Sequence, residues 1–160
     1  MGDIVTASGT RFYIGGSSVT SAVDTLAEFE AISVWTEVGL LEDLGEVGDE
    51  ASSVTGAAIG DGRIRKAKGA RDAGTMNVIC FHDPLDVGQD ALIAAEATNN
   101  NYPFKLVLPD SPSGAYSDTI QYFRGLVMSK RLRVGTNDNI IRRTFNVGVN
   151  SEIFEDPAST

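Results

Sequence analysis

The longest regular pattern of apolar and polar residues runs from Ile120 to Val149 and predicts two long strands joined by a turn. Alternate side chains of a strand point to opposite faces. Alternate positions are apolar on both arms: Tyr122, Leu126, Met128, Leu132 and Val134 on the first, and Ile141, Phe145, Val147 and Val149 on the second. Residues 135–139 (GTNDN) supply the turn, because Gly and Asn tolerate left-handed backbone conformations. A hairpin this long either curls around a barrel or offers its edge to a neighbour.

Four shorter segments also predict strands, at residues 11–14, 31–38, 74–81 and 102–108. The second of them alternates clearly and places Ile32 and Val34 on one side. The third is apolar at both alternating sets of positions, which predicts that both of its faces are covered.

Residues 86–99 carry the only clear helix signal in the chain. Asp86 is followed three residues later by Gln89, a spacing typical of a capping box at a helix start. The apolar stripe of this helix is Val87, Ala91, Leu92 and Ala95. Three asparagines at 99–101 end the pattern. We expect this helix to cover the outer face of the 74–81 strand.

Residues 39–71 lack a regular apolar pattern and contain seven glycines with acidic residues between them. Segments of this length without secondary structure are uncommon in compact domains and are usually functional or disordered. We predict a long, mobile loop with at most one strand near residues 51–57. Basic residues follow Gly56–Gly62, but the GxxxxGK[ST] motif and the strand–helix context of a phosphate-binding loop are missing.

Both ends of the chain are predicted to be arms. Residues 1–10 are small and polar, and residues 150–160 form a short tail. In this tail Ile153 and Phe154 either pack on their own subunit or hook a neighbour.

The overall composition, 160 residues with 42% apolar and 22% charged side chains, is typical of one soluble globular domain. Seventeen glycines and a single tryptophan favour a turn-rich β protein. No apolar run approaches the ~20 residues of a membrane span, and the N-terminus lacks a signal-peptide pattern. We therefore expect synthesis in a cytoplasm and no membrane association. Cys80 is the only cysteine, so an internal disulfide is excluded.

The net charge of −9 argues against a sequence-specific nucleic-acid binder, because such proteins normally carry a basic surface. The charges are also segregated, with ten acidic and no basic residues between Phe12 and Gly62. Eleven of the thirteen basic residues form two groups: Arg63, Arg65, Lys66, Lys68 and Arg71, then Arg124, Lys130, Arg131, Arg133, Arg142 and Arg143. Such segregation can set the direction in which one subunit docks on the next, while any single charge can equally be a solvated surface residue.

The sequence predicts no catalytic, metal or cofactor site. His82 is the only histidine and shares a strand face with Cys80, but two ligands are too few for zinc. Asn137-Asp138-Asn139 lacks EF-hand spacing and is explained by the hairpin turn. The acidic residues between 42 and 50 have no aromatic sugar platform nearby that would support a glycosidase pair.

Several short motifs occur in a characteristic order. They are VGLLEDLGE (38–46), Asp83-Pro84 with the helix ending in ALIAA (91–95), YPFKL (102–106), and YFRGLV (122–127) with its closing strand 141–149. Together they resemble the tail tube proteins of long, flexible-tailed bacteriophages, over roughly residues 30–153. The corresponding subunits of gene transfer agents are similar to the same proteins. No single motif is specific, so the resemblance rests on their order and spacing.

The resemblance implies a mainly β fold with one α-helix. In it, a β-sandwich or split barrel of two packed sheets carries a long mobile loop and terminal arms. It also implies a structural role rather than an enzyme. Subunits close into hexameric rings, and the rings stack into the hollow tube of a virion tail that delivers DNA. The implied partners are further copies of the chain, a tape measure protein, a tail terminator and distal tail or baseplate proteins. DNA would pass through an acidic lumen without specific binding, and no cofactor is implied.

The segregated charges and the C-terminal tail supply the candidate contacts between subunits or rings. Arginines that faced the lumen would hold DNA, so we expect the basic residues of the long hairpin to be paired across a contact. No lumen-facing residue is identified. The candidate contact residues are Glu42, Asp43, Glu46, Asp49, Glu50, Arg63, Arg65, Lys66, Lys68, Arg71, Arg131, Arg133, Arg142, Arg143, Ile153 and Phe154.

Two alternative functions remain open. The tube protein of a contractile tail or secretion system would have the same features. A carbohydrate-binding β-sandwich module, from a different class, would be a monomer with an exposed aromatic cluster. The aromatic residues of this chain are instead spread through the predicted strands.

Overall fold

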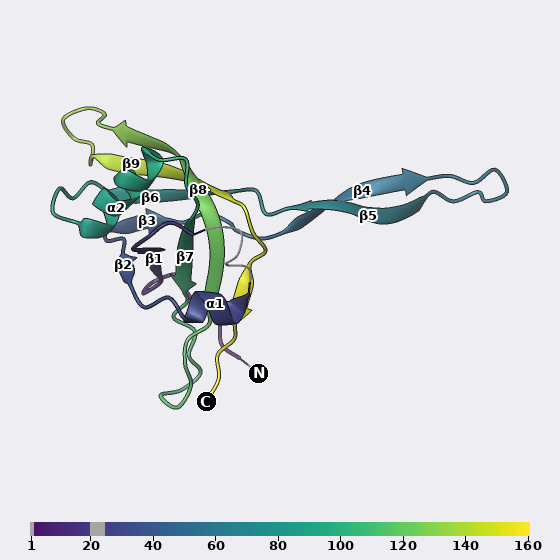
Figure 1. Ribbon diagram of the computed structural model, residues 1–160, viewed down its shortest axis with the longest axis horizontal. Coiled ribbons are helices and arrows are strands. Elements are labelled where there is room, and N and C mark those ends of the chain that lie inside the picture. Colours follow the sequence, from purple (N-terminus) through teal and green to yellow (C-terminus); the bar gives the residue numbers. More distant parts are fainter. Residues whose placement is uncertain (1, 20–24) are drawn as a thin grey trace.

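The computed structural model describes residues 2–19 and 25–160 and consists mainly of antiparallel strands (Figure 1). The strands are β1 (Arg11–Gly15), β2 (Trp35–Glu37), β3 (Leu41–Asp43), β4 (Glu50–Gly56), β5 (Arg65–Asp72), β6 (Thr75–Phe81), β7 (Tyr102–Val107), β8 (Ile120–Arg133), β9 (Arg142–Val149) and β10 (Phe154–Asp156). The helices are α1 (Leu26–Glu30) and α2 (Val87–Glu96). The predicted mainly β class is confirmed, but the short helix α1 has no counterpart among the predicted elements.

The main sheet has the strand order β2-β1-β7-β8-β9-β6-β3, with β10 added beside β8. Strand β8 organises it, because its first half pairs with β7 and its second half with β9. Gly125 marks the change of partner, since it lies opposite Tyr102 on one side and Val149 on the other. The predicted hairpin over 120–149 is therefore present as β8 and β9.

The two edge strands of this sheet, β2 and β3, are separated in the chain by residues 38–40 only. The four Cα–Cα steps from Glu37 to Leu41 span at most about 14 Å, so the sheet must curl until its edges meet, which makes it a split barrel. Residues 38–40, called the crossing below, are hydrogen-bonded to strands on both sides. The Val38 N–H donates to the Phe12 carbonyl of β1, and the Leu40 carbonyl accepts from the Phe81 N–H of β6. Leu40 has a φ of 53°, a conformation unusual for a bulky residue.

Helix α2 ties this crossing to the barrel. Asp86 caps the helix and accepts hydrogen bonds from the N–H groups of Gln89 and Gly39. The Gln89 side chain, 1% exposed, donates to the carbonyls of Phe81 and Gly39. It accepts from the Asp83 N–H. The predicted capping box is thus half right: Asp86 caps the helix, whereas Gln89 joins the helix to two strand ends.

The hydrophobic core lies inside the barrel and draws on both halves of the sheet. Phe12, Phe104 and Phe123 come from one half and Val78 and Phe145 from the other, all fully buried. The rings of Phe104 and Phe123 stack at 5.3 Å between centroids. Helix α2 adds its buried residues Leu92 and Ala95 to this core. It contacts chiefly β8, β2 and β1, so its predicted position on the outer face of residues 74–81 is wrong.

A β-bulge in β8 overturns the predicted alternation of its side chains. The register with β9 shifts between Val127, opposite Val147, and Ser129, opposite Asn146. The extra residue, Met128, is exposed, and beyond it the parity of the strand is reversed. Before the bulge, Phe123 and Val127 face the core, so the prediction that the even-numbered positions do so is wrong there independently of the bulge. Of the predicted set on the second arm, Phe145, Val147 and Val149 are buried, whereas Ile141 precedes β9 and is exposed.

A second aromatic cluster covers the other side of β8 and accounts for α1. The Tyr122 ring lies 5.9 Å from Phe29 of α1 and 6.0 Å from Trp35 of β2, and Phe29 lies 5.5 Å from Phe154 of β10. The Lys105 amine sits 5.0 Å from the Trp35 ring centroid. Burial, followed by the charge of Arg11, lowers the pKa of this amine. The predicted strand 31–38 shrinks to β2, and Val34 is exposed.

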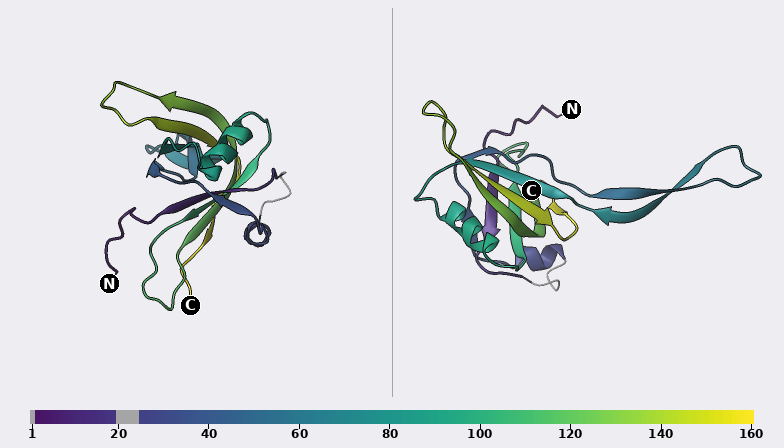
Figure 2. Two further views of the ribbon diagram at one scale, coloured as in Figure 1. Left: turned by 90° about the vertical axis from the view of Figure 1, so that its left-hand side faces the viewer. Right: turned by 90° about the horizontal axis from the view of Figure 1, so that it is seen from above.

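Strands β4 and β5 form a separate two-stranded ribbon that projects far from the barrel, as Figure 1 and the right-hand view of Figure 2 show. The predicted irregular loop over 39–71 is therefore wrong in this part, although a strand near 51–57 is present as β4. Residues 2–10 contain no helix or strand, and residues 1 and 20–24 lie outside the described chain. No helix among the described residues is long and apolar enough to cross a membrane.

Candidate subunit interface

The β4–β5 ribbon, called the arm below (residues 50–72), lacks a hydrophobic core of its own. Its strands pair from Glu50 opposite Asp72 to Gly56 opposite Arg65. None of its residues is buried, and all but three are exposed. An isolated two-stranded hairpin is at best marginally stable in water. An arm with both faces open to solvent is therefore a surface that can be covered by a partner.

The register of the arm collects its charges on one face. Ala51 lies opposite Arg71, Ser53 opposite Lys68 and Thr55 opposite Lys66, with a bulge between the first two pairs. Directly opposed residues share a face, so the three cations lie together among small side chains. The other face carries Val54 opposite Ala67 and is uncharged over this stretch. The middle of the arm thus has one basic face and one weakly apolar face, and Glu50, Asp72 and Arg65 add charges at the two ends of the apolar face.

The tip of the arm exposes apolar side chains. Ile59 is completely exposed and Ile64 is 64% exposed. The turn between them is held by Asp61, which accepts from the Arg63 N–H at 3.2 Å and from Arg65 Nε at 2.7 Å. Burying an isoleucine contributes about 1.5–3 kcal/mol, so this tip would gain free energy by entering an apolar groove.

Two matching turns carry the chain from the barrel into the arm and back. Asp43 Oδ1 accepts from the Gly45 N–H and Asp72 Oδ1 accepts from the Gly74 N–H, each at 2.8 Å. Both glycines have positive φ, 65° and 71°, which glycine adopts without strain. The repeated Asp-x-Gly is visible in the sequence, but nothing in the sequence marks it as the base of a ribbon.

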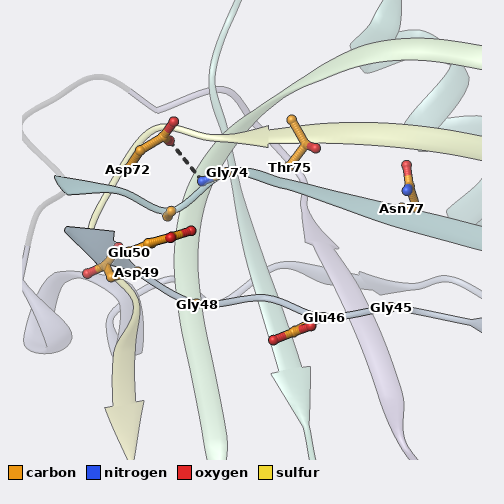
Figure 3. Close-up of a pocket in the computed structure, with 10 residues that line it drawn as sticks. Gly45, Glu46, Gly48, Asp49, Glu50, Asp72, Gly74, Thr75 and Asn77 are labelled. Atoms are coloured by element: carbon orange, nitrogen blue, oxygen red, sulfur yellow. Dashed lines mark hydrogen bonds between the residues drawn. The ribbon is translucent and has the colours of Figure 1, made fainter. Parts of the chain in front are cut away.

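An acidic hollow of about 640 Å³ lies at the root of the arm, as Figure 3 shows. Its carboxylates are Glu46, Asp49, Glu50 and Asp72. Three of these were candidate contact residues, and the structure gathers them here. Lys66 and Lys68 lie further out along the arm, whereas Arg71 lies at the root and lines a neighbouring hollow with Asp49 and Asp72.

A more apolar groove of about 590 Å³ lies on the barrel beside the arm root. Leu41, Leu44, Leu106 and Leu108 line it, and residues 7–10 of the N-terminal arm form one wall. Glu42 and Asp43 stand at its edge. This groove was not predicted from the sequence, because its leucines come from segments more than 60 residues apart.

The remaining candidate contacts have partners within their own subunit or lie on exposed surface. Arg142 Nε pairs with Glu42 at 2.5 Å, and Arg143 Nε donates to His82 Nδ1 at 3.0 Å, so neither needs a neighbouring subunit for a partner. Phe154 packs on Phe29, and Ile153 packs against the core. Arg131 and Arg133 are exposed at the far end of β8.

Cys80 and His82 do not form a reactive or metal-binding pair in the part of the chain described. The Cys80 thiol is buried, and burial followed by the charge of Asp86 raises its pKa to about 11. The thiolate, which is the reactive form, is therefore scarce. No group of three or more His, Cys, Asp or Glu among the described residues is placed to hold a metal ion.

Comparisons with known proteins place the fold. No known family matches the sequence, and no curated protein matches it. Among solved structures, the chain is similar to the SPP1 tail tube, with a TM-score of 0.65 and 12% identity over 96% of this chain and 80% of that one. It is also similar to a chain of the anti-feeding prophage baseplate, 6-fold symmetrised, with a TM-score of 0.67 and 7% identity over 98% of both chains. The chain therefore shares the fold of a tail tube protein.

Proposed function

We propose that this chain is the structural subunit of the tube of a phage or phage-like tail. In this proposal the subunits close into hexameric rings, and the rings stack into a hollow conduit for DNA. The observation that carries it is the arm: a ribbon without a buried residue, projecting from a barrel whose fold is shared with the SPP1 tail tube. The arm gains little stability from contacts within its own subunit, and contacts with neighbouring copies would supply that stability.

Charge supports a conduit through which DNA slides. The arm holds five basic and three acidic side chains, a net charge of +2. The rest of the chain holds eight basic and nineteen acidic side chains, a net charge of −11. A barrel with this surplus repels phosphates, while the basic arm lies apart from it. The six-fold symmetry applied to the similar baseplate structure supports a hexameric ring.

The proposed partners follow from the proposed location in a tail. They are further copies of this chain, a tape measure protein within the tube, a tail terminator at one end and distal tail or baseplate proteins at the other. DNA passes without specific binding, and the subunits are made in the cytoplasm of the bacterial host. A gene transfer agent would use the chain in the same way.

A tube of a contractile tail or secretion system is the second candidate. The similarity to the anti-feeding prophage baseplate covers 98% of the chain, slightly more than the similarity to the SPP1 tail tube at 96%. Both candidates share the ring and the arm contact. They differ in what passes through the lumen.

Negative-stain electron microscopy of the concentrated protein tests the proposal. Rings or tubes with a central channel and six-fold class averages are expected. Trypsin should cleave the arm first in dilute protein, at sites such as Arg63 and Lys68, and assembly should protect them. Particles without a channel, or a monomer at every concentration, would contradict the proposal.

A further inference from the structure

The position of the leucine-lined groove excludes an occupant from its own arm. The groove includes Leu41–Gly45, the segment that leads directly into the arm. The arm then runs away from the barrel (Figure 1), and its seven-residue strand β4 spans about 23 Å. While β4 and β5 stay paired, the tip cannot fold back to the groove. A tip found there must belong to another copy.

The tip and the groove match in their apolar chemistry. The groove presents Leu44 and Leu108, both only partly buried, beside the nearly buried Leu106. The tip presents Ile59 and Ile64 with exposed side chains. Each surface alone exposes apolar area to water, and contact between the tip and the groove buries the apolar area of both.

The charges at the edge of the groove favour the arm tip over the exposed N-terminal arm. Asp43 makes no ion pair within the described part of the chain, and Glu42 lies next to it. The arm tip brings Arg63 with its isoleucines. The N-terminal arm also exposes Ile4, but the neighbouring side chain is the acidic Asp3, which the acidic edge would repel. The end of the β8–β9 hairpin also exposes Leu132 and Val134 beside Arg131 and Arg133, and the cysteine test below distinguishes it from the arm tip.

We propose that the groove lined by Leu41, Leu44, Leu106 and Leu108 receives the arm tip of a second copy. Ile59 and Ile64 enter the groove, and Arg63 pairs with Asp43 at its edge. Donor and acceptor surfaces differ, so the contact is heterologous and propagates into a ring or a filament. The inference rests on the proposed tube function and adds the site at which the arm binds.

Paired cysteines test this contact directly. In assembled Leu44→Cys/Ile59→Cys protein we expect disulfides between chains, found by mass spectrometry of the cross-linked peptides. Native Cys80 is buried and serves as an internal control. Ile59→Cys/Asn137→Cys, which moves one thiol to the β8–β9 turn, should not cross-link. Cross-links from Leu44→Cys to Ile4→Cys instead would overturn the proposal, because they would make the N-terminal arm the occupant.

Charge exchange gives an independent test. Asp43→Arg or Arg63→Asp should each raise the concentration needed for assembly by about tenfold or more, because each places like charges together. Mixing the two variants should restore assembly, since every groove then finds an opposite charge on the tip of the other variant. Asp138→Arg, the same change in the β8–β9 turn, should leave assembly unaffected, and equal thermal unfolding should show that all variants fold.

The outcomes separate this inference from the tube proposal. Tubes that form without the Leu44→Cys/Ile59→Cys cross-link, or a mixture that fails to recover, would overturn the groove contact and leave the tube function standing. A protein that forms no rings or tubes at all would overturn both.

Discussion

The two long hairpins of the molecule use the same antiparallel pairing in opposite surroundings. In the β8–β9 hairpin, Phe145 and Val147 are completely buried in the barrel core. In the arm, no residue between 50 and 72 is buried. The first hairpin is stabilised by the apolar area that it removes from water within its own subunit. The second has only its backbone hydrogen bonds and cross-strand pairs, so its surface is left for another molecule.

The length of a hairpin therefore does not determine its stability. Backbone pairing alone gives a hairpin marginal stability, and burial of one face adds most of the remainder. Removing the arm should therefore spare the barrel, and damaging the barrel should destroy both parts. Four variants test this difference between the barrel and the arm.

Excision of the arm should have the largest effect on assembly and almost none on folding. Glu50 lies directly opposite Asp72, so an Asn-Gly turn can replace residues 51–71 as a two-residue hairpin loop. We expect a folded monomer whose unfolding free energy lies within about 0.5 kcal/mol of the wild type, since surface changes seldom exceed this. Analytical ultracentrifugation and urea unfolding measure the two properties. An unfolded product would show that the arm supports the barrel.

Truncation of a core aromatic should have the largest effect on stability. Phe145→Ala leaves a cavity in a fully buried site and should cost about 3–5 kcal/mol of unfolding free energy. Val54→Ala, at an exposed position opposite Ala67 in the arm, should cost less than about 0.5 kcal/mol. Urea unfolding followed by Trp35 fluorescence compares the two variants. Equal losses would mean that the arm is packed in the free protein.

Replacement of Gln89 should weaken the closure of the barrel by a smaller amount. Gln89→Leu keeps a similar volume but leaves the carbonyls of Phe81 and Gly39 without their buried donor. An unsatisfied buried group costs about 1–3 kcal/mol, and we expect a loss of that size. Hydrogen exchange should quicken at residues 38–40 and be unchanged in the arm. The matched control is the exposed neighbour Asp90→Asn.

The smallest effect is expected from Asp110, which binds both the N–H and the hydroxyl of Thr119, at 2.7 and 2.6 Å. These hydrogen bonds, led by the hydroxyl, lower the pKa of the Asp110 carboxyl below its ordinary 3.8. Because the folded pKa is the lower one, the stabilisation is present above pH 3.8 and is lost as the pH falls through the folded value. Asp110→Asn should therefore lower the melting temperature at neutral pH, with the difference vanishing in strong acid. A difference that persists there would contradict this origin.

The sequence predicts the barrel better than the arm, for a physical reason. Strands such as β6 and β9 bury one face or both, and this burial selects the alternation that reveals them. Strand β5, RKAKGARD, buries neither face, so nothing selects an apolar period and its glycine and charges are typical of a loop. The bulge at Met128 left no signal either, because one extra residue changes register without changing composition.

The candidate interface was only partly predictable. The basic group 63–71 is visible in the sequence alone, since segregated charge needs no structure to be seen. The groove could not be found, because residues 7–10, 41–45 and 106–108 meet only after the sheet has curled. The intrasubunit pairs of Arg142 and Arg143 were missed because Glu42 and His82 lie 100 and 61 residues away in sequence.

The way in which the arm joins the barrel decides how a pull on it is resisted. Strand β5 continues into β6 through residues 73 and 74 only, and β6 pairs with β9 through seven consecutive residue pairs. Antiparallel hydrogen bonds lie perpendicular to the strands, so tension along the arm loads this ladder in shear. Its bonds then share the force and must break together, whereas a sideways pull would peel them one at a time. The attachment of the arm to the barrel therefore resists a force along the arm axis more strongly than a force across it.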